Sequence, residues 1–136
     1  MNADREDGAA AWTAWFDSAE YHVTVGVCEF IAAQHDPRRA PRAINLIQQG
    51  TAQRPTERTR SRAFDHIALA RAYVRHEQLD AARDATSTAL DLFGHVASSR
   101  VADRLRELDH ELQAAPDSTL TVTTRNEIER ALQTRG

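Results

Sequence analysis

Glu107 and His110 lie three residues apart on one expected helix, the spacing that di-iron helix bundles use for their ligands. Such a centre needs two of these pairs and two further glutamates, and the sequence holds no second pair. The six histidines lack metal-ligand spacing, and no Ser-His-Asp, glycine-rich phosphate-loop or H-E-x-x-H pattern occurs. We therefore interpret Glu107 and His110 as a surface pair, and the sequence predicts neither an enzyme nor a metal or cofactor.

Cys28 is the only cysteine among 136 residues, which excludes a disulfide framework within the chain. It lies on an expected apolar stripe, where a cysteine usually acts as a small hydrophobic residue. No apolar run approaches about 18 residues, so no membrane span is predicted. Residues 1–8 are acidic and do not resemble a secretion signal. These features predict a cytoplasmic protein with no membrane contact.

The net charge of −3 argues against a dedicated nucleic-acid-binding protein, although the charge is unevenly distributed. Residues 38–62 carry seven arginines and one acid, whereas residues 1–37 carry seven acids and one arginine. The arginine-rich stretch has no interleaved aromatic residue on which a base could stack. We interpret it as a solvated face that balances the acidic N-terminal third, or as a contact for an acidic partner.

Helix-favouring residues dominate, and the apolar residues recur with a period of 3.6. Asp36-Pro37, Pro55-Thr56 and Ser98 or Ser99 are start signals, and Gly94 is a stop signal. We expect helices over residues 19–34, 37–53, 55–76, 79–93, 98–114 and 124–134, with 119–123 (TLTVT) as an extended linker. The expected inward residues are Tyr21, Val25, Cys28 and Ile31 or Ala32; Ala40, Ala43, Ile44 and Ile47; Ala63, Ile67, Ala70 and Tyr73 or Val74; Ala82, Ala85, Ala89 and Leu92; and Val101, Leu105, Leu108 and Leu112.

Residues 63–96 match the 34-residue helix–turn–helix repeat pattern. Ala70, Ala82 and Ala89 occupy its small positions, where two helices approach closely, and Tyr73 is expected to fill the gap between them. Residues 18–54 form a degraded copy of the same unit. Its small position is either Cys28 or Gly26, the latter with two extra residues before the turn.

Three segments carry a family resemblance: WFDSAE with GVC at residues 15–28, residues 60–92, and SSRVADRLRELDHELQ at 98–113. Together they resemble the C-terminal tetratricopeptide-repeat region of actinobacterial regulators of the Xre helix-turn-helix type. The resemblance implies an all-α superhelical regulatory domain that follows a DNA-binding domain. The 136 residues include no helix-turn-helix domain before these repeats, which indicates either a piece of a longer regulator or a free-standing relative. In either case, direct nucleic-acid binding is not expected of this segment.

The sequence thus predicts an all-α fold, a short antiparallel helix-pair array (α-solenoid) of about six helices. We expect a flexible acidic segment over 1–8, the repeat domain over 9–115, and a linker with a short helix over 116–136. Repeats of this kind bind ligands on the concave face lined by their first helices. Paired guanidinium groups there suit a carboxylate or phosphate. The expected concave-face residues are Phe64, Ile67, Arg71, Val74, Arg75, His22, Glu29, Arg106 and His110.

Trp12, Trp15 and Phe16 are the densest aromatic cluster, and aromatic residues often anchor interfaces. They either cap the first helix or pair with a second copy of the chain. The predicted function is regulatory sensing, in which the concave face binds a protein, a peptide or a small acidic ligand. The alternatives are homodimerisation through Trp12, Trp15 and Phe16, and a small-molecule-binding or enzymatic domain with a buried cavity.

Overall fold

The computed structural model describes residues 18–135, which form six α-helices and no strand. The first helix covers residues 18–32 and is followed by a short 3-10 helix, η1 (Pro37–Arg39). The others are α2 (Ala40–Gln53), α3 (Thr59–Arg75), α4 (Leu79–Val96), α5 (Ser99–Ala114) and α6 (Thr119–Arg135). The prediction of an all-α fold of about six helices is confirmed.

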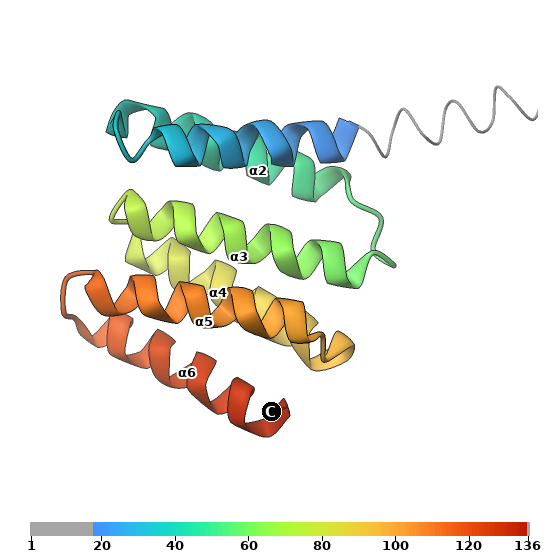
Figure 1. Ribbon diagram of the computed structural model, residues 1–136, viewed down its shortest axis with the longest axis vertical. Helices are drawn as coiled ribbons and strands as arrows, with labels where there is room; N and C mark the ends of the chain where they lie inside the picture. Colours follow the sequence, from blue (N-terminus) through green and yellow to red (C-terminus); the bar gives the residue numbers. More distant parts are fainter. Residues whose placement is uncertain (1–17, 136) are drawn as a thin grey trace, which may run out of the picture.

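The helices stack as three neighbouring pairs, with the first helix and α2 at one end and α5 and α6 at the other (Figure 1). α3 and α4 form the middle pair and pack on each other most extensively. α3 also contacts α2 and α5, while α6 contacts α4 and α5. One face of the stack is therefore built from the first helix, α3 and α5. Within residues 18–135, no helix combines the length and apolar character needed to span a bilayer.

Two of the predicted helix starts are visible as side-chain caps. The carboxylate of Asp36 accepts a hydrogen bond from the backbone N–H of Arg38, and Pro37 occupies the first position of η1. The hydroxyl of Ser98 accepts from the backbone N–H of Val101 at 3.3 Å, so α5 begins where the sequence predicts. α3 begins at Thr59, four residues after the proline expected to start it.

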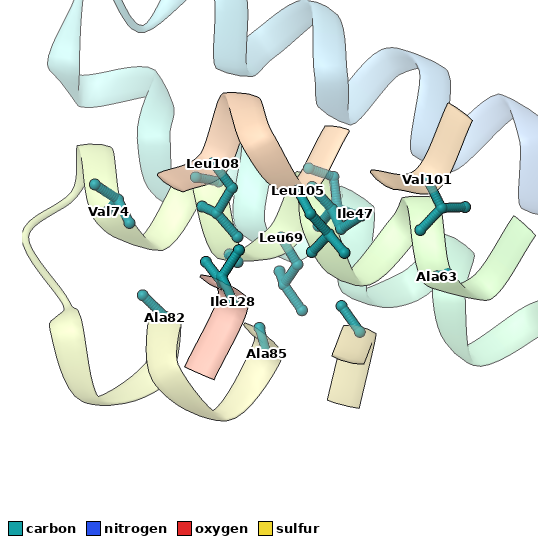
Figure 2. Close-up of a cluster of buried hydrophobic side chains, with 14 of the residues drawn as sticks. Ile47, Ala63, Leu69, Val74, Ala82, Ala85, Val101, Leu105, Leu108 and Ile128 are labelled. Carbon is teal, nitrogen blue, oxygen red and sulfur yellow. The ribbon is translucent and has the colours of Figure 1, made fainter. Parts of the chain in front are cut away.

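The core matches the inward positions predicted for α2 to α5. The predicted alanines, isoleucines and leucines of these helices are buried, and Figure 2 shows their side chains meeting between the helices. Ile128 of α6 is fully buried and points into the same cluster. Tyr73 is partly buried and packs against this cluster, and its hydroxyl also accepts a hydrogen bond from Gln48 of α2. Its ring therefore reaches toward the preceding pair.

The inward stripe predicted for the first helix is wrong at three of its positions, while Val25 and Ala32 are half-buried. Tyr21 is 64% exposed, Ile31 is 55% exposed, and Cys28 is exposed as well. Small residues set the rotation of this helix instead, because a Cβ added at Gly26 would lie 2.7 Å from Cγ1 of Ile47 on α2. Gly26, rather than Cys28, is the residue at the close approach to α2. The residues that face the interior are Ala19, Gly26, Phe30 and Ala33.

The predicted stop at Gly94 is also wrong, because α4 continues to Val96. The residue that ends the helix in a left-handed conformation is Ala97, with φ of 47°, and its N–H donates to the carbonyl of Phe93. A glycine favours a helix end but does not enforce one. The turn at Glu77 and Gln78 is as predicted, and Glu77 takes a positive φ of 58° there.

The extended linker predicted over residues 119–123 is wrong, since α6 begins at Thr119. The β-prone threonines are accommodated in the helix by local hydrogen bonds. The hydroxyl of Thr121 donates to the carbonyl of Pro116, and that of Thr124 donates to the carbonyl of Leu120. Both threonines are buried, and α6 packs on α4 and α5. Tertiary packing therefore overrides the local preference for extended structure.

Candidate functional site

A groove of about 330 Å³ is lined by residues of the first helix, α2, α3 and α5. Its apolar part comes from three helices, with Ile47 of α2 at the base. Its polar residues are Asp65, Arg71 and Arg104. The groove therefore combines an apolar floor with charged side chains, the usual make-up of a ligand site. The apolar residues lining it are Val23, Val27, Phe30, Ile47, Phe64, Ile67 and Ala68.

Arg71 is held in place by α5. Its guanidinium donates to Oε1 of Glu111 at 2.6 and 2.9 Å, and Oε2 of Glu107 lies 3.8 Å away. These hydrogen bonds with Glu111 raise the pKa of the Arg71 guanidinium. The guanidinium carbon also lies 5.4 Å from the centre of the Phe30 ring. Arg71 thus joins α3, α5 and the first helix, and its charge is largely balanced within the protein.

Arg75 lies one helical turn after Arg71 and approaches the same ring, with its guanidinium carbon 5.7 Å from the Phe30 centroid. It is exposed and makes no ion pair with any residue between 18 and 135. The ring orients this guanidinium while leaving its N–H groups available to a ligand. Val74 and Arg75 border a second hollow of about 330 Å³, which Glu111 and Pro116 also line.

A buried charge cluster lies beside the groove, and the sequence analysis did not find it. Arg54, at the end of α2, donates to both carboxylate oxygens of Asp65 at 2.8 and 3.2 Å, and to Glu20 at 2.6 Å. The side chains of Arg54 and Asp65 are only 4% and 2% exposed. Burial raises the pKa of the Asp65 carboxyl, and the guanidinium of Arg54 opposes that rise. The cluster ties the first helix, α2 and α3 together.

Two of the predicted binding residues, His22 and Glu29, make contacts away from the groove. The ring Nδ1–H of His22 donates to the carbonyl of Ser18 at 2.7 Å. Glu29 accepts from Arg39 at 3.4 Å and lies 3.7 Å from Arg42. It therefore links the end of the first helix to η1 and the start of α2.

Arg106 and His110 lie on a different side of α5 from the groove. The buried stripe of α5 fixes its rotation, and this turns Arg104, Glu107 and Glu111 toward α3. Arg106 pairs with Asp103 at 2.9 Å and borders a small hollow near the start of α5. The structure therefore brings Phe64, Ile67 and Arg71 together in the groove, with Arg75 beside it.

The arginine-rich stretch does not form one basic surface. Arg38, Arg39 and Arg42 lie at the start of α2, where Asp36 and Glu29 pair with them. Arg54 is buried, and the remaining three precede or begin α3, near the opposite end of α2 along its axis. α2 is 14 residues long, which separates the two groups by about 21 Å.

Trp12, Trp15 and Phe16 lie outside the described residues, as does the acidic segment before them. Across residues 18–135, no three histidine, cysteine, aspartate or glutamate side chains are grouped so that they could hold a metal ion. Comparison of the chain with protein-family models, curated proteins and solved structures finds no match.

Proposed function

We propose that this chain is a non-catalytic, tetratricopeptide-like domain whose groove binds a protein or peptide segment, or a small acidic ligand. The observation that carries the proposal is the apolar groove with an oriented, exposed guanidinium beside it. An apolar group of the ligand would enter between Phe30, Phe64 and Ile67. An acidic group would bind Arg75, whose N–H groups can form two parallel hydrogen bonds with a carboxylate.

The groove is suited to binding rather than catalysis. The residues that line it include no serine, cysteine or histidine that could act as a nucleophile or base. Its one carboxylate, on Asp65, accepts hydrogen bonds from Arg54 at both oxygens. A carboxylate used in this way is poorly placed to take a proton from a substrate.

The wider role that we propose is regulatory sensing in the cytoplasm, in or beside a transcriptional regulator. The resemblance of residues 60–113 to regulator repeats supports this context. The division of the arginine-rich stretch into two groups supports a role without direct nucleic-acid contact. Ligand binding would act by favouring one arrangement of the helix pairs, or by presenting a bound partner.

Peptide titration followed by amide NMR tests the proposal. The probes are two capped peptides, one alternating leucine and glutamate and one alternating leucine and lysine. We expect the first to shift the amide signals of Phe30, Ile67 and Arg75, and the second to shift them much less. Equal binding of both peptides, or shifts confined to residues outside the groove, would contradict the proposal.

A matched pair of arginine variants separates the Arg75 contact from general charge attraction. Arg75→Gln should weaken binding of the leucine–glutamate peptide by about tenfold, because a hydrogen bond to a charged group contributes about 1.5–3 kcal/mol. Arg100→Gln removes an exposed arginine from the start of α5 and should leave the affinity nearly unchanged. Similar losses in both variants would show that the peptide responds only to net charge.

A further inference from the structure

The first helix carries four exposed residues at the spacing of a coiled-coil seam. Tyr21, Thr24, Cys28 and Ile31 follow one another at intervals of three, four and three, the a and d positions of a heptad. All four are exposed, and Tyr21 and Ile31 are two of the three large hydrophobic residues exposed in residues 18–135. We call these four residues the outer seam.

The outer seam is uncharged. Between residues 21 and 32 the only acidic or basic side chain besides His22 is Glu29, which pairs with Arg39 and Arg42 of η1 and α2. Depletion of charge distinguishes the centre of an interface from ordinary surface. A strongly charged partner would find no complement here, whereas a second uncharged seam would.

The spacing of the outer seam makes it complementary to itself. Tyr21 and Ile31 are equally distant from residue 26, and so are Thr24 and Cys28. If two copies of the helix run antiparallel about residue 26, Tyr21 lies opposite Ile31 of the partner subunit and Thr24 lies opposite Cys28 of the partner subunit. The large residues then pair at both ends and the small ones at the centre, as a two-fold interface requires.

We infer that the chain forms a two-fold homodimer through the outer seam. The seam points away from α2, because Gly26 and Val23 make the contacts to that helix. Val23, Val27 and Phe30 of the same helix line the groove on another side. The first helix and α2 form one end of the stack (Figure 1).

The outer seam covers only one short helix, so the dimer is expected to be weak. A helix of 15 residues is about 22 Å long and offers four turns to its partner. One helix pair of this length buries less than the roughly 1,600 Å² of a standard stable interface. The dimer is therefore a reversible one whose population rises with protein concentration.

Sedimentation velocity over a wide concentration range tests the dimer. We expect the average mass to rise toward that of two chains. Ile31→Glu should raise the dissociation constant by at least about tenfold, because it places an unpaired carboxylate against Tyr21 of the partner subunit in an apolar contact. Val122→Glu is the matched control, since Val122 is 49% exposed but lies on α6. Far-UV circular dichroism checks that both variants stay folded. A wild-type chain that is monomeric throughout, or equal effects of the two variants, would overturn the inference.

A disulfide test checks the antiparallel register. A chain with T24C and C28S is mixed with the wild-type chain and mildly oxidised, which should join it to Cys28 of the wild-type copy. A chain with N45C and C28S is the control, because Asn45 is exposed on α2, and it should give at most a trace of that product. Equal yields of the disulfide-linked dimer from the T24C and N45C chains would overturn the antiparallel register. Should residues 1–17 cover the seam instead, the chain would stay monomeric and Cys28 would react slowly with a thiol reagent.

Discussion

The first helix and α2 approach each other through glycines, whereas α3 and α4 approach through alanines. A Cβ at Gly50 would lie 2.5 Å from Cγ2 of Val23, and one at Gly26 would lie 2.7 Å from Ile47. In the middle pair, Ala70, Ala82 and Ala89 are fully buried and leave room for a methyl group each. The first pair is thus packed more closely, and its glycine contacts fix the rotation of the helix more firmly than its hydrophobic stripe does.

The two pairs also differ in how an arginine links them to the next helix. Arg54 is buried and joins the first pair to Asp65 of α3. Arg71 joins α3 to Glu111 of α5, but its side chain is 27% exposed. Removing one partner from a buried pair leaves an uncompensated charge, whereas water can replace a partner at the surface. The first link should therefore matter far more to stability than the second.

The largest expected effect comes from breaking the buried link. Asp65→Ala leaves the Arg54 guanidinium with Glu20 alone, and it should lower the free energy of unfolding by about 3–5 kcal/mol. Chemical denaturation measures the loss. The double variant Arg54→Met with Asp65→Leu removes both charges and should recover most of it. A loss below about 1 kcal/mol for Asp65→Ala would show that the pair contributes no more than a surface bridge.

The next largest effect on stability is expected from the contact between Gly50 and Val23. Gly50→Ala adds a methyl group against Val23 and the carbonyl of Ala19, and overpacking of this kind costs about 1–3 kcal/mol. Ala89→Gly is the reverse change in the middle pair, and it should cost about 1 kcal/mol through helix propensity. Thermal unfolding of the two variants sharpens the comparison. If Gly50→Ala stabilises the protein, the first helix and α2 do not approach each other as closely as the distance between Gly50 and Val23 indicates.

Breaking the partly exposed link between Arg71 and Glu111 should have a smaller effect. A double-mutant cycle with Arg71→Met and Glu111→Gln should yield a coupling energy of about 1 kcal/mol or less, weakened by added salt. The same cycle on Arg83 and Glu127, which join α4 to α6 at 3.1 Å, is the matched comparison. A coupling energy for Arg71 and Glu111 as large as the loss expected for Asp65→Ala would show that the two links contribute equally to stability.

The smallest effect concerns pH. Burial and the nearby charge of Arg62 lower the pKa of His66, whose Nδ1 is buried without a hydrogen-bond partner among the described residues. The unfolded chain therefore binds a proton more readily, so stability should fall as pH drops below 6.5 toward the lowered folded pKa. The change should stay below about 1 kcal/mol because the side chain is only half-buried. His66→Gln should flatten this part of the stability profile, and an unchanged profile would assign the slope to another group.

Local signals predicted the middle of the chain well. Asp36 and Ser98 cap helices as expected, and the apolar stripes of α2 to α5 are buried as their periodicity indicates. These features depend on neighbours within a few residues, which the sequence places directly. The groove residues Phe64, Ile67 and Arg71 were found for the same reason, since α3 follows the repeat pattern most closely.

Most of the errors have a different cause, because they depend on a partner that lies elsewhere in the sequence, whereas the stop expected at Gly94 was misplaced by a few residues within one helix. The outward turn of Tyr21 follows from a glycine contact with α2, and the helical form of Thr121 follows from packing against α4 and α5. The link between Arg54 and Asp65 spans 11 residues and two helices. One signal for it was available, since Asp65 is a charged residue within the apolar pattern of α3.

The sequence by itself determined the all-α fold, the order of its helices and the inward faces of α2 to α5, because periodicity and caps act over short distances. Only the tertiary structure decided how the first helix is rotated, which side of α5 meets Arg71, and that residues 119–123 join a helix. Those outcomes depend on which helices touch, and that is a property of the packed chain as a whole. The groove and the outer seam both lie on the first helix, whose rotation the packing decided.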